Sequence, residues 1–147
     1  MPTIIIPANS TQRQLVADLL TTENLPVADL PNPLENFVIA INNQIIVGTA
    51  GLEVYGSYGL LRSVAVSSQY RGKQIAQQLL VAIEDIAKAK RLTEIYLLTE
   101  TAELYFKKKG FLNIHRQHVP AEIKASSEFA HVCPVSAVVM KKMVQPV

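Results

Sequence analysis

The feature that most constrains the fold is residues 60–80, where an apolar run passes through a polar segment into an amphipathic pattern. Residues 60–66 are rich in β-branched and aliphatic side chains, which predicts a strand. From about residue 72 to residue 90, apolar side chains recur at the spacing of one helix face, at Ile75, Leu79, Ile83 and Ile86. The sequence therefore predicts a buried strand that leads through a short loop into a long helix.

The loop between this strand and this helix has the features of an anion site. The first amides of a helix lack acceptors inside the helix and lie at the positive end of its dipole. A pyrophosphate group fits such a place. Arg71 and Lys73 add positive charge on either side of Gly72. These residues predict a phosphate-binding turn.

The rest of the chain alternates between strand and helix patterns. Strands or extended segments are expected at residues 3–6, 37–41, 44–51, 94–99, 111–119 and 135–143. Helices are expected from an Asn9 or Ser10 cap onward, and at residues 24–30, 102–109 and 120–130. Asn42-Asn43 predicts a tight hairpin, and Gly110 a helix end. This order predicts an α/β or α+β fold with one sheet layer and helices packed on its faces.

Length and composition limit the classes of protein. A chain of 147 residues with 49% hydrophobic and 18% charged residues is expected to form a single domain, 1–147. A net charge of +2 gives no basis for nucleic-acid binding. The lone Cys133 excludes an intramolecular disulfide and suits a reducing compartment. The apolar run near the N-terminus is too short for a signal peptide or membrane span, so a soluble cytoplasmic protein without membrane partners is expected.

The loop resembles the pyrophosphate loop of the GNAT superfamily of acyl-CoA-dependent N-acetyltransferases, Gln/Arg-x-x-Gly-x-Gly/Ala. The match holds at Arg71 and Ala76 and departs at Gln74, where the family usually has glycine. Gln74 fits if its backbone is helical, because only a positive φ would require glycine. Residues 102–111 resemble a second block of the family, with an aromatic pair, basic residues and Gly-Phe.

The resemblance implies a GNAT-like fold, with a mixed, mostly antiparallel central sheet and helices on both faces. It also implies acetyl-CoA as cofactor. Its pantetheine arm is expected along the backbone of Val64, Ala65 and Val66, where an amide of Val64 or Ala65 serves as oxyanion donor. The pyrophosphate is expected on Arg71, Gly72, Lys73, Gln74, Ile75, Ala76 and Gln77. Thr99 is the expected substitute for an asparagine that many relatives use to bind pantetheine. The alternative for residues 64–66 is a core strand without ligand contacts.

Three further stretches narrow the resemblance. Residues 51–56 with 60–63, residues 96–103 and residues 129–141 resemble the N-acetyltransferases associated with arsenic resistance operons. This subgroup implies a detoxifying acyltransferase without fixing its substrate.

Acetyl transfer needs a general base, and Glu53 is the first choice, directly or through a water. Its strand is otherwise largely apolar, so its carboxylate either faces solvent or has a function. Arg62 is expected to bind a substrate carboxylate, with an ion pair to Glu53 as the alternative. Tyr55 is expected to be a second substrate-binding residue.

The general acid is less well defined. Many relatives carry a tyrosine where this chain has Phe106, and the neighbouring Tyr105 is the candidate proton donor. One step along a helix rotates the hydroxyl by about 100°. The alternatives are that Tyr105 only packs, that Tyr55 or a water donates, or that the thiolate leaves without an acid.

The expected function is acetyl-CoA-dependent transfer of an acetyl group to the amine of a small or amino-acid-like molecule. The alternative is a non-catalytic GNAT-fold module that senses acyl-CoA or another ligand. A third hypothesis is soft-metalloid binding at Cys133, helped by His131 and His115 or His118, although a buried structural cysteine is the simpler interpretation. No metal site is expected, and a homodimer is one assembly that the sequence allows.

Overall fold

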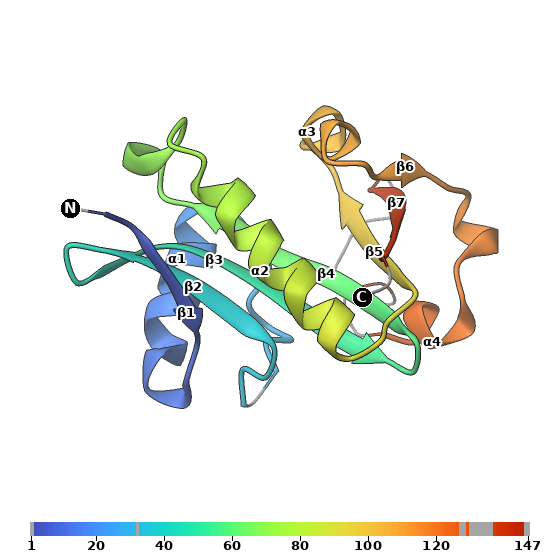
Figure 1. Cartoon of the computed structure of the whole chain (residues 1–147), viewed down its shortest axis with the longest axis horizontal. Helices are drawn as coiled ribbons and strands as arrows, with labels where there is room; N and C mark the ends of the chain where they lie inside the picture. The colour runs from blue at the N-terminus through green and yellow to red at the C-terminus, as the bar shows by residue number, and fades with distance from the viewer. Residues whose placement is uncertain (1, 32, 127–128, 130–136, 146–147) are drawn as a thin grey trace. The chain divides into compact units, whose positions relative to one another are not determined.

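The computed structural model describes residues 2–31, 33–126, 129 and 137–145 (Figure 1). The strands are β1 (Ile4–Pro7), β2 (Phe37–Asn42), β3 (Ile45–Tyr55), β4 (Tyr58–Val66), β5 (Glu94–Thr99), β6 (Leu112–Asn113) and β7 (Val138–Met143). The α-helices are α1 (Arg13–Thr22), α2 (Ile75–Ala89), α3 (Glu103–Lys108) and α4 (Ala121–Lys124). Three short 3₁₀ helices are η1 (Ser10–Gln12), η2 (Ser68–Tyr70) and η3 (Arg116–His118).

The described strands form a seven-stranded sheet in the order β1-β2-β3-β4-β5-β7-β6. The β4–β5 pair is parallel, whereas β1–β2, β2–β3, β5–β7 and β6–β7 are antiparallel. The predicted class, a mixed and mostly antiparallel sheet with helices, is confirmed.

Two compact units can be distinguished along the chain. The first comprises Met1–Glu53 and Arg62–Ile86, and the second comprises Val54–Leu61 and Ala87–Val147. Each is described by itself below.

The first unit contains the predicted hairpin. Asn42 pairs with Ile45, and the turn residues Asn43 and Gln44 have φ values of 52° and 64°. Two left-handed residues in a two-residue turn match the right-handed twist of the flanking strands. The hairpin prediction is confirmed, with the turn one residue later than expected.

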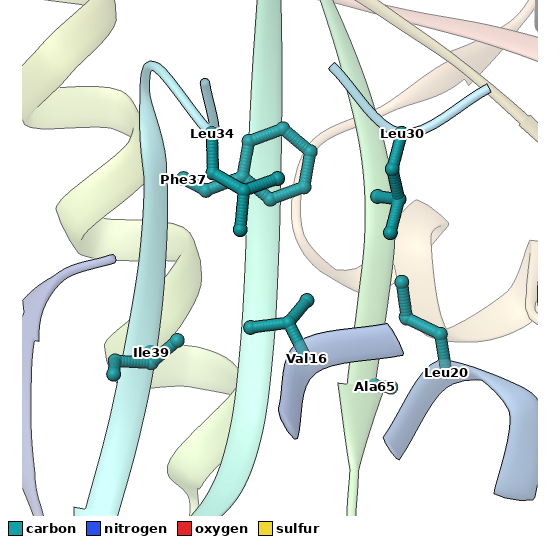
Figure 2. Packing of buried hydrophobic residues seen from close by; sticks show 7 residues of the cluster. All are labelled: Val16, Leu20, Leu30, Leu34, Phe37, Ile39 and Ala65. Atoms are coloured by element: carbon teal, nitrogen blue, oxygen red, sulfur yellow. The ribbon is translucent and has the colours of Figure 1, made fainter. Parts of the chain in front are cut away.

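Helix α1 covers one face of β2 in the first unit. Its side chains Val16 and Leu20 are fully buried and pack in one cluster with Phe37 and Ile39 of β2 (Figure 2). Leu30, Leu34 and Ala65 complete the cluster shown in the figure. The predicted cap is present: the Asn9 side chain accepts a hydrogen bond from the Thr11 amide at 3.0 Å, at the start of η1.

The start of α2 lies on the opposite face of β3. A Cβ added at Gly48 would lie 3.1 Å from Leu79 Cδ1 and 3.2 Å from Ile75 Cγ2. Gly51 lies three residues after Gly48 on β3, so the two positions point to opposite faces of the sheet. Gly51 points to the same face as its cross-strand partner, Phe37. Helices therefore pack on both faces of this part of the sheet, as expected.

The second unit is built around β5. Tyr58 of β4 pairs with Glu94 in parallel, and Thr99 pairs with Val138 of β7. Its core contains Leu60, Tyr96, Val119, Ile123 and Val139. Gly110, with φ of 96°, follows the end of α3, as predicted from the sequence.

Glu94 is the anchored carboxylate of this unit. Burial by itself raises the pKa of Glu94, but hydrogen bonds from Tyr96 Oη at 2.6 Å and Lys141 Nζ at 3.1 Å outweigh it and lower the pKa. Burial, followed by the bond to Glu94, raises the pKa of Tyr96.

Several expected boundaries are wrong. The helix expected at 24–30 is absent, because Asn24 has a φ of 61° and ends α1. The long helix begins at Ile75 rather than residue 72, and the segment 111–119 holds only β6 and η3. The helix expected at 120–130 is the short α4, and the last strand is described from Val138. Residues 127–128, 130 and 135–136 of these two expected elements lie outside the described part. No described helix has the length and apolarity that crossing a membrane requires.

Replacement of Gly51 tests the contact between β2 and β3. A Cβ at Gly51 would lie 2.4 Å from Phe37 Cζ, and Phe37 is 1% exposed, so the ring has little room to move. We expect Gly51→Ala to lower the free energy of unfolding by about 1–3 kcal/mol in denaturant titrations.

The control is the same substitution in a Phe37→Leu background, where the ring is absent. The loss caused by Gly51→Ala should then shrink. An equal loss in both backgrounds would mean that the Phe37 ring is not what excludes a larger residue.

Candidate active site

The loop between β4 and α2 belongs to the first unit and has an unusual backbone. Gly72 has a φ of 77° and Gln74 a φ of 62°, and α2 begins at the next residue, Ile75. The condition under which Gln74 could replace glycine without strain, a helical backbone, is not met: this residue adopts the left-handed conformation that glycine accepts without strain. The left-handed residues delay the start of the helix, and alternating conformations of this kind gather successive amides around an anion.

The loop is open where a ligand has to approach. Arg71, Gly72, Lys73 and Gln74 are exposed, and no atom lies within 4 Å of a Cβ built at Gly72. Ile75 is 2% exposed and anchors the helix start against Gly48. The first helical amides, those of residues 75–77, have no acceptor within α2 because of their position.

The two basic side chains of this loop have different partners. Arg71 Nη2 pairs with Glu23 Oε1 just after α1, and Arg71 Nε donates to Val66 O at 3.3 Å. Lys73 Nζ lies 5.5 Å from the centre of the Tyr70 ring. Glu23 was not anticipated from the sequence, where no local pattern marks it.

An unsatisfied acceptor lies in the first turn of α2. Among the described residues, Gln77 Oε1 is the one buried side-chain polar atom without a hydrogen-bond partner. Buried polar atoms normally have partners, so an orphaned oxygen here suits a ligand that supplies a donor. Coenzyme A carries amide and hydroxyl donors as well as a diphosphate, and the open loop, its basic side chains and this acceptor fit that chemistry.

A buried charge cluster lies deeper in the first unit. Asp29 is bidentate, with Oδ2 and Oδ1 each 2.8 Å from Nη1 and Nη2 of Arg62. Glu53 Oε2 accepts a further bond from Nη1 at 2.9 Å, and Ser63 Oγ one from Nε at 3.0 Å. The Arg62, Asp29 and Glu53 side chains are 0%, 8% and 14% exposed. The ion pair that was the alternative interpretation of Arg62 is present, and protein carboxylates hold the guanidinium.

Ser63 shows how β4 accommodates this cluster. Its φ of 58° is left-handed although it lies inside the strand. The break in extended geometry lies where Arg62 Nε donates to Ser63 Oγ, although the side chains of successive strand residues normally point to opposite faces. Val64 and Val66 are half-buried and Ala65 is buried on the following stretch.

The remaining expected site residues belong to the second unit. Tyr105 is half-buried, and its ring packs edge-on against Phe106 at 5.4 Å. Burial raises the pKa of Tyr105, which keeps its phenol protonated at neutral pH. Phe106, at the position of the usual tyrosine, is 7% exposed. Thr99 Oγ1 accepts a bond from the Ala102 amide at 3.0 Å, and Tyr55 packs beside the core of this unit.

No group of three or more metal-ligating side chains occurs in the described ranges. Cys133 and His131, on which the metalloid hypothesis depends, lie outside them. The His115 and His118 rings are 6.0 Å apart.

Sequence comparison gives the family. A family model described as "Acetyltransferase (GNAT) domain" matches residues 33–112, more than half of the 147-residue chain. The chain therefore belongs to the GNAT acetyltransferase family, whose members are acetyl-CoA-dependent acyltransferases. A search of curated proteins finds no significant match.

Solved structures share the fold at low identity. N-acetylglutamate synthase from Neisseria gonorrhoeae, complexed with coenzyme A and L-arginine, matches with a TM-score of 0.81 and 19% identity, over 97% of this chain and 33% of that chain. This chain thus spans about a third of the synthase. A GNAT-family acetyltransferase from Staphylococcus aureus Mu50 matches with a TM-score of 0.78 and 23% identity, over 98% and 100% of the two chains. The ribosomal-protein-S18-alanine N-acetyltransferase of Escherichia coli matches with a TM-score of 0.75 and 14% identity, over 99% of this chain and 96% of that chain.

The left-handed loop residues give a paired prediction. Gly72→Ala adds a side chain to a positive-φ residue in open space, so we expect a loss of about 1 kcal/mol of stability from backbone strain alone. Gln74→Gly removes such strain and should add about 0.5–1 kcal/mol. Denaturant titration measures both. A stabilising Gly72→Ala, or a destabilising Gln74→Gly, would contradict the loop geometry.

Removal of Arg62 tests the buried cluster. Arg62→Leu leaves two largely buried carboxylates without their cation, and we expect a loss of about 3–5 kcal/mol of stability. The control is Arg71→Leu, whose side chain is 60% exposed and which should lose less than about 1 kcal/mol. Equal losses for the two variants would show that the Arg62 cluster is not held as described.

Proposed function

We propose that this chain transfers the acetyl group of acetyl-CoA to the amine of a small or amino-acid-like molecule. The observation that carries the proposal is the exposed loop at residues 71–74, with two left-handed residues, which delivers the first amides of α2 to an anion. The diphosphate is held by residues 71–77. The pantetheine arm follows the backbone of residues 64–66, and Thr99 supplies a hydroxyl to it.

Glu53 is the proposed general base. Within the buried cluster it has the most exposed side chain, 14%, against 8% for Asp29 and 0% for Arg62. It is therefore the member most able to reach an acceptor or a water. It takes a proton from the acceptor ammonium, and the amine nitrogen attacks the thioester carbonyl. The backbone amide of Val64 or Ala65 stabilises the oxyanion.

Collapse of the tetrahedral intermediate breaks the C–S bond, and the nitrogen gives its remaining extra proton to water, which leaves a neutral N-acetyl product. The thiolate of coenzyme A takes a proton from Tyr105, from Tyr55 or from water. The raised pKa of Tyr105 is compatible with a donor at neutral pH. Arg62 is engaged by Asp29 and Glu53, so we assign it to organising the site, and Tyr55 to the substrate side.

The acceptor is not fixed by the fold. The structural neighbours include a protein complexed with L-arginine and an enzyme named for an alanine of a ribosomal protein. A role in detoxification, suggested by the resemblance to arsenic-resistance-associated acetyltransferases, and a cytoplasmic location stay predictions. None of the relatives named above carries an arsenic-related description.

The alternative is a module that binds acyl-CoA without catalysis. The burial of Phe106, at the position of the usual tyrosine proton donor, favours it. Cofactor binding without release of free thiol over a broad panel of amines would support this alternative.

Replacement of Glu53 tests the catalytic proposal. We expect Glu53→Gln to lower kcat by about 100-fold, because the amide cannot accept the proton, with little change in acetyl-CoA affinity. Thiol release over an amine panel measures kcat, and calorimetry measures affinity. Glu100→Gln, at an exposed carboxylate, is the matched control and should retain full activity. A fully active Glu53→Gln enzyme would exclude this residue as the base.

A further inference from the structure

Asp29 forms a two-point ion pair with the Arg62 guanidinium. Both of its carboxylate oxygens bind the two terminal nitrogens, and its backbone oxygen lies 3.5 Å from Nη1. Glu53 Oε2 accepts a bond from Nη1 of the same guanidinium, the nitrogen that Asp29 Oδ2 also contacts. A planar guanidinium prefers a two-point pair with a carboxylate, and Asp29 occupies that geometry.

Removal of the Asp29 charge changes what Arg62 offers to Glu53. Arg62 is fully buried, so its charge needs a carboxylate partner. With Asp29 neutral, the uncompensated charge draws Glu53 into a closer pair. A carboxylate drawn into a two-point pair directs both of its oxygens at the guanidinium, so neither is directed at the acceptor.

We propose that Asp29 is a positioning residue for acetyl transfer: it pairs with both terminal nitrogens of Arg62 and thereby limits the pairing of Glu53 with this guanidinium, so that Glu53 can accept the proton of the acceptor. This role rests on the proposed function, in which Glu53 is the base. Asp29 lies in the connection between α1 and β2, whereas Glu53 is on β3 and Arg62 is on β4. Through Asp29, this connection contributes to catalysis.

The Asp29 segment has a second, independent anchor. Arg13 of α1 donates from Nη2 to Leu30 O at 2.9 Å and from Nη1 to Pro31 O. Leu30 and Leu34 are also buried in the core below this segment (Figure 2). The segment is thus held by contacts other than those of Asp29, and Asp18→Asn, at an exposed aspartate of α1, provides a matched control that does not touch Arg62.

The test is a double-mutant cycle on kcat with Asp29→Asn and Glu53→Gln. We expect Asp29→Asn alone to lower kcat about tenfold or more while the Kd for acetyl-CoA, measured by calorimetry, stays within about twofold. In the Glu53→Gln background the same change should alter the residual kcat by less than about twofold, because the effect acts through Glu53. Asp18→Asn should leave kcat close to the wild-type value.

A second variant guards against a folding defect of Asp29→Asn. Asp29→Glu keeps a carboxylate that can pair with the buried Arg62. We expect Asp29→Glu to retain most of the kcat that Asp29→Asn loses, because the Arg62 guanidinium then still has a second carboxylate partner.

The outcomes distinguish a failure of the positioning role of Asp29 from a failure of the proposed base, Glu53. An equal loss from Asp29→Asn in both backgrounds, a comparable loss in Asp18→Asn, or a loss in Asp29→Glu as large as that in Asp29→Asn would overturn the positioning role alone. Full activity in Glu53→Gln would overturn the base role and, with it, the role of Asp29. Thiol release from acetyl-CoA by the wild-type enzyme stays the separate test of acetyl transfer itself.

Discussion

The backbone at the entrance to α2 is the constraint on which the rest of the site depends. Two left-handed residues, Gly72 and Gln74, postpone the helix until Ile75, whose buried side chain lies against Gly48. This combination fixes the helix start on the sheet while the four residues before it stay exposed. At Gln74 the chain tolerates strain that glycine would avoid, which indicates that loop geometry outweighs local conformational preference here.

The buried charge cluster is the second organising element of the first unit. Two carboxylates surround one arginine, so the formal charge of the cluster is negative. Arg62 already pairs with both of them and therefore does not bind a substrate carboxylate in the simple way expected from the sequence. Buried ion pairs contribute little net stability compared with well-packed apolar groups, but they fix geometry. Here they connect the segment after α1, β3 and the left-handed break at Ser63.

Sequence reasoning succeeded where the signal is local. The Asn-rich hairpin turn, the Asn9 cap, the end of α3 at Gly110 and the bounds of β5 all follow from residues adjacent in the chain. It failed where tertiary structure decides. The left-handed backbone of Gln74 was missed because the family's preference for glycine there was not taken as a requirement. The helix expected at residues 24–30 is absent, since Asn24 is left-handed after the end of α1. The partners of Arg62 and Arg71 lie 33 and 48 residues away, so Asp29 and Glu23 could not be assigned. The one sequence feature that pointed to Asp29 is its position as the single charged residue in the otherwise apolar run 25–30.

The most direct test of the account is a titration of the ¹⁵N-labelled protein with coenzyme A, followed by amide chemical shifts. The account predicts saturable binding in which the largest shifts fall on the amides of residues 72–77, while amides around Gly110, another left-handed glycine, change little. The absence of saturable binding, or shifts concentrated away from the start of α2, would contradict the claim that this loop holds the diphosphate of the cofactor.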